Sequence, residues 1–203
     1  MSRRASLFAA ALAALLAGCV SFPNPLPRAD EGDWGRERAR WTRHGELYDR
    51  LDTRAFANAT FLSGEARLAR AERIAAWRAM TPAERAAQIA TDRADGEAYD
   101  EFFLTFFTPE KNENDLALKH SVWRVALVLP DGEVLPDQVE ELPVDPTLRT
   151  LYPFIGDFDT LYRMRFVRFP GRPPLSSQAF TLRIAGPSGR LDLAWLAGGA
   201  TAR

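Results

Sequence analysis

Cysteine is almost absent from this chain of 203 residues, in which Cys19 is the only one. A single thiol cannot close a disulfide within the chain or supply the several cysteine ligands of a zinc or iron–sulfur site. The fold must therefore be held together by its packed core. Histidine is nearly as scarce: His44 and His120 are the only two, and their separation lacks the spacing of metal ligands. We therefore expect neither histidine-dependent catalysis nor a histidine metal site.

The chain also lacks a strong net charge. Its 26 basic and 27 acidic side chains leave a formal charge of −1 at neutral pH. Nearly all the basic residues are arginines, because Lys111 and Lys119 are the only lysines. Such a balance produces no net field that would attract nucleic acid or anionic lipid. We expect no nucleic-acid partner, and the sequence predicts no cofactor.

Long apolar runs are confined to the amino terminus. Ser2-Arg3-Arg4 carries positive charge, and residues 5–16 are apolar apart from Ser6. This run is too short to span a bilayer, which takes roughly 20 residues. A charged start, an apolar run and a site of small residues follow one another in the order of an export signal. Residues 1–18 are therefore predicted to be a signal peptide.

The end of this segment, Leu16-Ala17-Gly18-Cys19, resembles the lipobox of bacterial lipoproteins. That resemblance implies cleavage before Cys19 and lipidation of its thiol, which would remove the thiol from any nucleophilic chemistry. Several acyl chains together hold a protein stably on a membrane. In such lipoproteins an aspartate after the cysteine favours the inner membrane. Val20 stands there instead, so the resemblance implies an outer-membrane location.

The export route remains open between two alternatives. Residues 2–7 partly resemble a twin-arginine signal, which exports proteins already folded. Ser6 stands where that motif prefers an aromatic residue, and two arginines are also common in ordinary signal peptides.

Beyond the signal, the sequence predicts an α+β protein in three parts. Residues 19–33 contain three prolines followed by three acidic residues, a composition typical of an extended tether. Residues 34–98 are predicted to be a helical segment of about three helices. Residues 99–203 are predicted to form an antiparallel β-sandwich, for which an immunoglobulin-like arrangement is one option.

The helical prediction depends on spacing and on capping signals. Apolar residues three and four apart predict a first helix from residue 34 to about residue 57. Ser63 is placed to cap a second helix that ends near Met80. Thr81-Pro82-Ala83-Glu84 is a capping box with proline at the first helical position. The third helix is expected to stop at Gly96. The residues on the face of the first helix are Trp41, His44, Tyr48 and Leu51.

The strand prediction depends on alternation and turns. Residues 102–107 are apolar at nearly every position, which is typical of a central strand covered on both faces. Apolar residues alternate over 122–129, 161–169, 180–184 and 191–195. Turns rich in glycine and proline separate these segments, so several short antiparallel strands are expected.

Three groups of residues are candidate sites. Asp157 and Asp159 stand two apart among aromatic residues, a pattern that could serve a glycan hydrolase. The simpler interpretation is a turn in which the aspartates accept hydrogen bonds from backbone amides. Glu113 and Asp115 lie in an oxygen-rich loop that could bind calcium in an adhesion-like module, although the order of an EF-hand is missing. An ordinary solvated polar loop is the simpler interpretation.

The third group is arginine-rich. Four arginines fall on the polar phases of predicted strands and would form an anion-binding or partner-binding face if those strands share one side of a sheet. The alternatives are a solvated face paired with acids and a face covered by the helices. These arginines are Arg124, Arg163, Arg165 and Arg183.

Together these features predict a lipid-anchored lipoprotein of the bacterial outer membrane, facing the periplasm or the cell surface. A non-enzymatic binding or assembly module fits them best, with an envelope protein or a glycan as its partner. The glycan hydrolase and the calcium-stabilised module are the alternatives.

Overall fold

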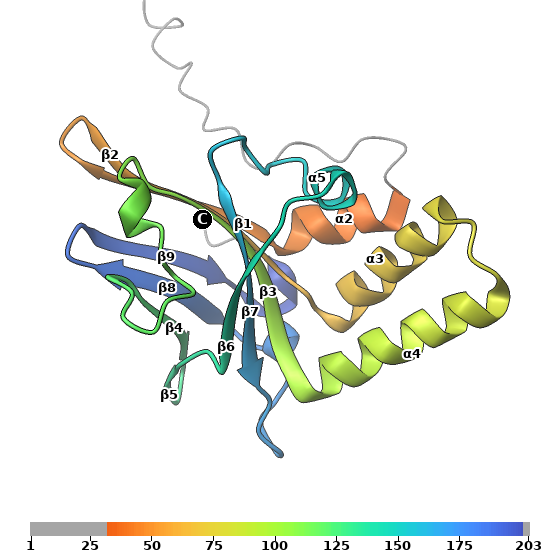
Figure 1. Ribbon diagram of the computed structural model, residues 1–203. Helices are drawn as coiled ribbons and strands as arrows, with labels where there is room; N and C mark the ends of the chain where they lie inside the picture. The colour runs from red at the N-terminus through yellow and green to blue at the C-terminus, as the bar shows by residue number, and fades with distance from the viewer. Residues whose placement is uncertain (1–31, 201–203) are drawn as a thin grey trace, which may run out of the picture.

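The computed structural model describes residues 32–200 (Figure 1). The predicted signal peptide, the lipidation site at Cys19 and most of the predicted tether lie outside the described residues. Within the described part, no helix has both the length and the hydropathy needed to cross a membrane. The helices and strands, in chain order, are α2 (Gly32–Trp41), β1 (Thr42–Asp49), β2 (Asp52–Phe61), α3 (Gly64–Trp77), α4 (Pro82–Ala98), β3 (Tyr99–Phe107), β4 (Arg124–Leu129), β5 (Gly132–Val134), β6 (Gln138–Leu142), α5 (Pro146–Leu151), β7 (Thr160–Val167), β8 (Phe180–Gly186) and β9 (Gly189–Trp195).

The strands form two antiparallel sheets. One sheet has five strands in the order β1-β2-β3-β7-β6, and the other has four in the order β5-β4-β8-β9. Every recorded strand pairing is antiparallel. The α+β class with antiparallel sheets is therefore confirmed. The helices, however, alternate with strands along the chain and do not form one amino-terminal segment.

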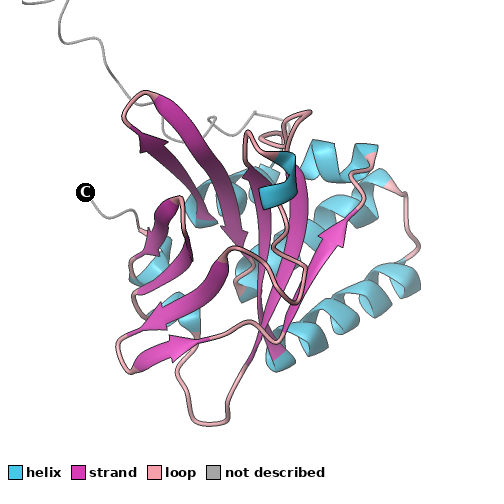
Figure 2. Cartoon of the chain, turned by 60° about the vertical axis from the view of Figure 1, so that its left-hand side comes forward, coloured by secondary structure: helices cyan, strands magenta, loops and turns pink. Residues whose placement is uncertain are grey.

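Strand β3 lies at the centre of the five-stranded sheet and is covered on both faces, as its apolar run predicts. The ring of Phe102 faces the four-stranded sheet, with its centroid 5.7 Å from that of Trp195. The next residue, Phe103, faces the helices and stacks on Tyr152 at 5.0 Å. The guanidinium of Arg70 on α3 lies over the same Phe103 ring. Figure 2 shows the longer helices gathered on one side of the long strands.

The predicted first helix is wrong beyond Trp41. Residues 42–61 form the β1–β2 hairpin, with Leu51 almost fully exposed at its tip. His44 and Tyr48 are exposed on β1 and share no helical face with Trp41, which is buried. The physical reason lies in β2, where Ala55, Ala57 and Ala59 are all completely buried. Their period of two is the signature of a strand with one face in the core.

The predicted caps of the next two helices are confirmed. The Ser63 hydroxyl accepts a hydrogen bond from the amide of Ala66 at 3.1 Å and so begins α3. Thr81 and Glu84 form the reciprocal capping box of α4, with Pro82 in its first turn.

The helix ends differ slightly from the prediction. Helix α3 ends at Trp77 and not at Met80, whereas α4 continues past Gly96 to Ala98. Gly96 does not terminate its helix. A Cβ atom there would lie 3.1 Å from the Cδ of Arg67, so the glycine allows α4 to pack closely against the Arg67 side chain of α3.

Candidate functional site

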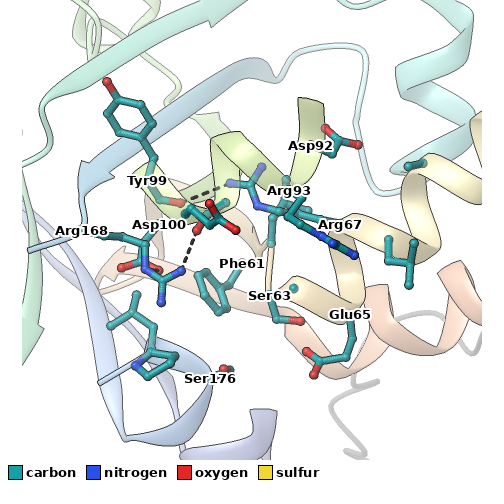
Figure 3. Close-up of a pocket in the computed structure, with 18 of the residues that line it drawn as sticks. Phe61, Ser63, Glu65, Arg67, Asp92, Arg93, Tyr99, Asp100, Arg168 and Ser176 are labelled. Atoms are coloured by element: carbon teal, nitrogen blue, oxygen red, sulfur yellow. Dashed lines mark hydrogen bonds and ion pairs between the residues drawn. The ribbon is translucent and has the colours of Figure 1, made fainter. Parts of the chain in front are cut away.

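A pocket of about 360 Å³ lies where α3 and α4 meet the start of β3 (Figure 3). The Ser63 cap starts α3 directly after β2, so the amino terminus of α3 forms part of the wall. The segment after β7 and a short turn (Leu175–Ser177) complete it. Its apolar side chains are Phe61, Leu62, Leu68, Ala71, Ile89, Pro174 and Leu175. Its charged side chains are Glu65, Arg67, Asp92, Arg93, Glu97, Asp100 and Arg168.

Asp100, the second residue of β3, is a largely buried carboxyl group in this wall, with a side chain only 14% exposed. Its nearest cation is Arg168, whose Nε lies 3.6 Å from the Asp100 Oδ1, beyond hydrogen-bond distance. No other described residue donates a hydrogen bond to this carboxyl group. Burial raises the pKa of Asp100 to about 6, because the loss of hydration outweighs the attraction of the nearby arginines.

Arg168 is held by the end of α4. Its amide donates to the carbonyl of Ala98 at 2.9 Å, and its Nη1 donates to the carbonyl of Gly96 at 2.6 Å. These two bonds satisfy carbonyls at the carboxyl end of the helix, which also favours a nearby cation. The Nη2 of Arg168 donates no hydrogen bond to any described residue, and the side chain is 29% exposed. Figure 3 shows its guanidinium beside Asp100 and Phe61. It is therefore positioned to bind a ligand.

Arg67 and Glu101 lie beneath the pocket as a buried ion pair. The Arg67 Nη2 lies 3.5 Å from the Glu101 Oε2, and the two side chains are only 4% and 3% exposed. Glu101 also accepts a shorter hydrogen bond of 3.1 Å from the Nε of Arg165. The Nε and Nη1 of Arg67 have no hydrogen-bond partner in the described part of the chain. Burial lowers the pKa of Arg67, against the attraction of Glu101.

A second ion pair joins the two helices beside the pocket. Arg70 on α3 donates from Nη2 to the Oδ1 of Asp92 on α4 at 3.2 Å. The Oδ2 of Asp92 is buried and has no partner among residues 32–200. The wall thus combines guanidinium groups, carboxyl groups and apolar side chains, a composition suited to recognising a small ligand.

The four predicted arginines do not share one face. Arg124 on β4 and Arg183 on β8 belong to the four-stranded sheet, whereas Arg163 and Arg165 both lie on β7 of the other sheet. Arg124 and Arg183 both bind Glu133, at 2.7 and 3.1 Å.

Acids also pair with the arginines on β7. Arg163 pairs with Glu140, and Arg165 pairs with Glu101 and Asp95. Each of the four predicted arginines is therefore engaged by a carboxylate. Only Arg165 approaches the pocket, through its shared partner Glu101.

The two predicted aspartates lie in the loop between α5 and β7, outside the pocket. The Asp157 carboxylate is 82% exposed and pairs with Arg149 at 2.9 Å. The Asp159 carboxylate accepts a hydrogen bond of 2.8 Å from the amide of Gly156. Because the two carboxylates have different partners and neither lines this pocket, we do not propose glycan hydrolysis.

The oxygen-rich loop is tied together by hydrogen bonds. Asp115 accepts from the hydroxyl of Ser121 at 2.6 Å and from the amide of Val122 at 3.2 Å. The Glu113 carboxylate lies 3.4 Å from the hydroxyl of Ser188. In the described region, no group of three or more histidine, cysteine, aspartate or glutamate residues could hold a metal ion. We therefore propose no calcium site.

The two histidines are both surface residues. His44 lies between Asn58 and Glu46 on the exposed side of the hairpin, and its hydrogen bond lowers the pKa of Glu46. His120 is exposed in the loop before β4.

Sequence reasoning missed the pocket residues Arg67, Asp100 and Arg168. One local signal was available: Arg67 falls among the alanines of an apolar helix face, and Asp100 directly precedes a strongly apolar strand. Charged residues are rarely buried unless they have partners.

No protein-family model matches the chain, and neither a curated protein nor a solved structure matches it.

Proposed function

We propose that the protein is a bacterial envelope lipoprotein, held in the outer membrane by a lipid on Cys19, with a binding module as its folded part. The observation that carries the anchor is the sequence Leu16-Ala17-Gly18-Cys19 behind a short apolar run. Residues 19–33 would act as the tether between the lipid and the folded part.

The folded part suits recognition. In this proposal the two sheets form a two-layer sandwich, supported by contacts such as that between Phe61 of one sheet and Phe180 of the other, with ring centroids 5.2 Å apart. Such a core provides a rigid support for the pocket at its edge. Guanidinium and carboxyl groups beside apolar side chains can bind and orient a ligand without forming a covalent bond. The binding is therefore proposed to be non-enzymatic, with a small envelope ligand or a group on an envelope protein or glycan as the partner.

Membrane fractionation tests the anchor. The full chain, expressed in a bacterium with two membranes, should be recovered in the outer-membrane fraction. Cys19→Ser should abolish this recovery, because it removes the thiol that would carry the lipid. Val20→Asp is the matched control: it keeps the thiol and should move the protein to the inner membrane. Identical fractionation of the unchanged chain and Cys19→Ser would show that the anchor is not at Cys19.

A further inference from the structure

We propose that the pocket binds a small monocarboxylate with an apolar body, whose carboxylate contacts the side chains of both Arg168 and Asp100. Arg168 would supply the positive charge, and Asp100 would donate a hydrogen bond. This inference names the ligand class of the pocket and rests on the binding function proposed above.

Arg168 attracts the carboxylate of the ligand. Its Nη2 has no hydrogen bond within the described chain, and its Nε lies 3.6 Å from Asp100 without forming one. The planar guanidinium matches the geometry of a carboxylate and can bind both of its oxygens. The amide hydrogen bond to Ala98 holds the backbone of Arg168, and the Nη1 bond to Gly96 holds its side chain, so little conformational entropy would be lost when a ligand binds.

Helix α3 adds to this attraction. Its amino terminus, at Ser63 and Gly64, lines the same pocket, and the helix is 14 residues long. The positive end of a helix dipole favours a bound anion. Arg67 lies below, and its Nε and Nη1 nitrogens have no hydrogen-bond partner among the described residues, so that their N–H groups are further donors on the same side.

Asp100 determines which anion is accepted. An ionised Asp100 would repel an incoming carboxylate, whereas a neutral one can share its proton with it, as paired carboxyl groups do. The burial that raises the pKa of Asp100 makes the neutral form accessible at mildly acidic pH. The charges that act on Asp100 are those of Arg168, Arg67 and Arg172.

The remaining charged groups of the wall restrict the ligand further. Glu65, Asp92 and Glu97 are acidic and Arg93 is basic, and Asp92 is partly neutralised by Arg70 at 3.2 Å. A dianion such as a phosphate monoester would be opposed by these carboxylates as well as by Asp100.

A cation would be opposed by the arginines around Asp100. The apolar side chains of Phe61, Leu68 and Leu175 provide the surface for the body of the ligand. A cavity of about 360 Å³ has room for a small ring or a short chain.

Calorimetric titration of the full chain in detergent tests this inference with four probes that share a phenyl ring. Benzoate is the expected ligand, benzamide its neutral analogue, benzylamine its cationic analogue and phenyl phosphate the dianion. At pH 5, benzoate should bind at least about tenfold more tightly than benzamide or benzylamine, because a charge-assisted pair with guanidinium is lost in both. At pH 7, phenyl phosphate should bind more weakly than benzoate.

The pH dependence isolates Asp100. Between pH 5 and pH 7, a carboxyl group with a pKa of about 6 changes from mostly protonated to mostly ionised. Benzoate should therefore bind about tenfold more weakly at pH 7 than at pH 5. Asp100→Asn keeps a hydrogen-bond donor and has no charge to lose. This variant should bind benzoate equally at both pH values, about as tightly as the unchanged protein does at pH 5.

Two arginine variants complete the test. Arg168→Gln should weaken benzoate binding at pH 5 by about tenfold or more. Arg149→Gln, which removes an arginine outside the pocket, should leave it unchanged. Circular dichroism of each variant shows whether it is folded, and the Asp100→Asn measurement stands even if Arg168→Gln unfolds.

Several results would overturn the inference: no saturable benzoate binding at either pH, equal binding of benzoate and benzamide, or tighter binding of benzylamine. Retained pH dependence in Asp100→Asn would also overturn it. The lipid anchor is measured separately by fractionation. Failure of benzoate binding in an outer-membrane protein would reject only the ligand class, whereas loss of the anchor would leave the pocket result intact.

Discussion

The Arg67 guanidinium on α3 and the Glu101 carboxylate on β3 form an ion pair that joins a helix to the centre of the five-stranded sheet. Their closest atoms are 3.5 Å apart, and both side chains are almost completely removed from water. Glu101 is shared, because the Nε of Arg165 on β7 donates to the same oxygen at 3.1 Å. One carboxylate is thus shared by two arginines from different elements beside the pocket.

Loss of the Glu101 charge should therefore lower the free energy of unfolding more than loss of Arg67 does. Glu101→Gln leaves the buried Arg67 without an ion-pair partner and Arg165 with Asp95 alone. Breaking a buried pair in this way costs about 3–5 kcal/mol. Arg67→Met leaves Glu101 paired with Arg165 and should cost less. Urea unfolding of both variants gives the free energies. A larger loss in Arg67→Met would show that Arg165 does not share the carboxylate.

Asp100 should make the stability of the protein depend on pH. Its pKa is about 6 in the folded state and 3.8 in the ordinary reference state, so between these values the folded state binds the proton more tightly. Stability from this group is greatest below about pH 4 and is lost as the pH rises through 6.

Asp100→Asn removes this effect. At pH 8 the variant should be more stable than the unchanged protein by up to about 3 kcal/mol, at about 1.4 kcal/mol for each unit of pKa. Near pH 4 the difference should vanish. Urea unfolding at the two pH values measures it, with the exposed Asp157→Asn as control. A variant that is less stable at pH 8 would mean that the pairing of Asp100 with Arg168 outweighs its burial.

Gly186 and Gly64 should respond oppositely to alanine. A Cβ at Gly186 would lie 2.7 Å from Trp123 and 2.9 Å from the carbonyl oxygen of Val122. Overpacking of this kind costs about 1–3 kcal/mol. At Gly64, in the first turn of α3, nothing lies within 4 Å, so alanine should stabilise the protein by about 0.4–1 kcal/mol. Thermal unfolding compares them; equal shifts would contradict the packing described for the end of β8.

The capping box of α4 gives a further comparison. Thr81→Ala removes the hydroxyl that accepts from the Glu84 amide and should cost about 1 kcal/mol. Thr91 lies on the same helix and is exposed, with its hydroxyl bonded only to a carbonyl of the preceding turn. Thr91→Ala should change the free energy of unfolding by less than about 0.5 kcal/mol. If both changes cost the same, the cap does not stabilise the helix start.

Local features of the fold could be predicted from the sequence where a residue pattern is typical of a single structure. The caps at Ser63 and Thr81 and the two-sided strand around Phe102 and Phe103 are confirmed because capping and burial leave direct patterns. The β1–β2 hairpin could not be predicted in this way. Its buried strand positions are alanines, which are also the best helix formers. Its turn lacks glycine, and Arg50 adopts the positive φ of 59°.

The candidate site was hidden for a different reason. Arg67, Asp100 and Arg168 are separated in sequence and meet only because α3, α4, β3 and the end of β7 converge. Alternation showed that Arg124 and Arg163 point away from a core, but it could not show that they belong to different sheets. Which strands are neighbours is decided by the whole fold.

Mass spectrometry of the amino-terminal peptide, from protein expressed in a bacterium and extracted from its membranes, tests the lipoprotein account most directly. The account predicts that residues 1–18 are absent and that the peptide begins at Cys19, with a diacylglyceryl group on its sulfur. A peptide that still contains residues 1–18, or one with a free thiol at Cys19, would contradict it.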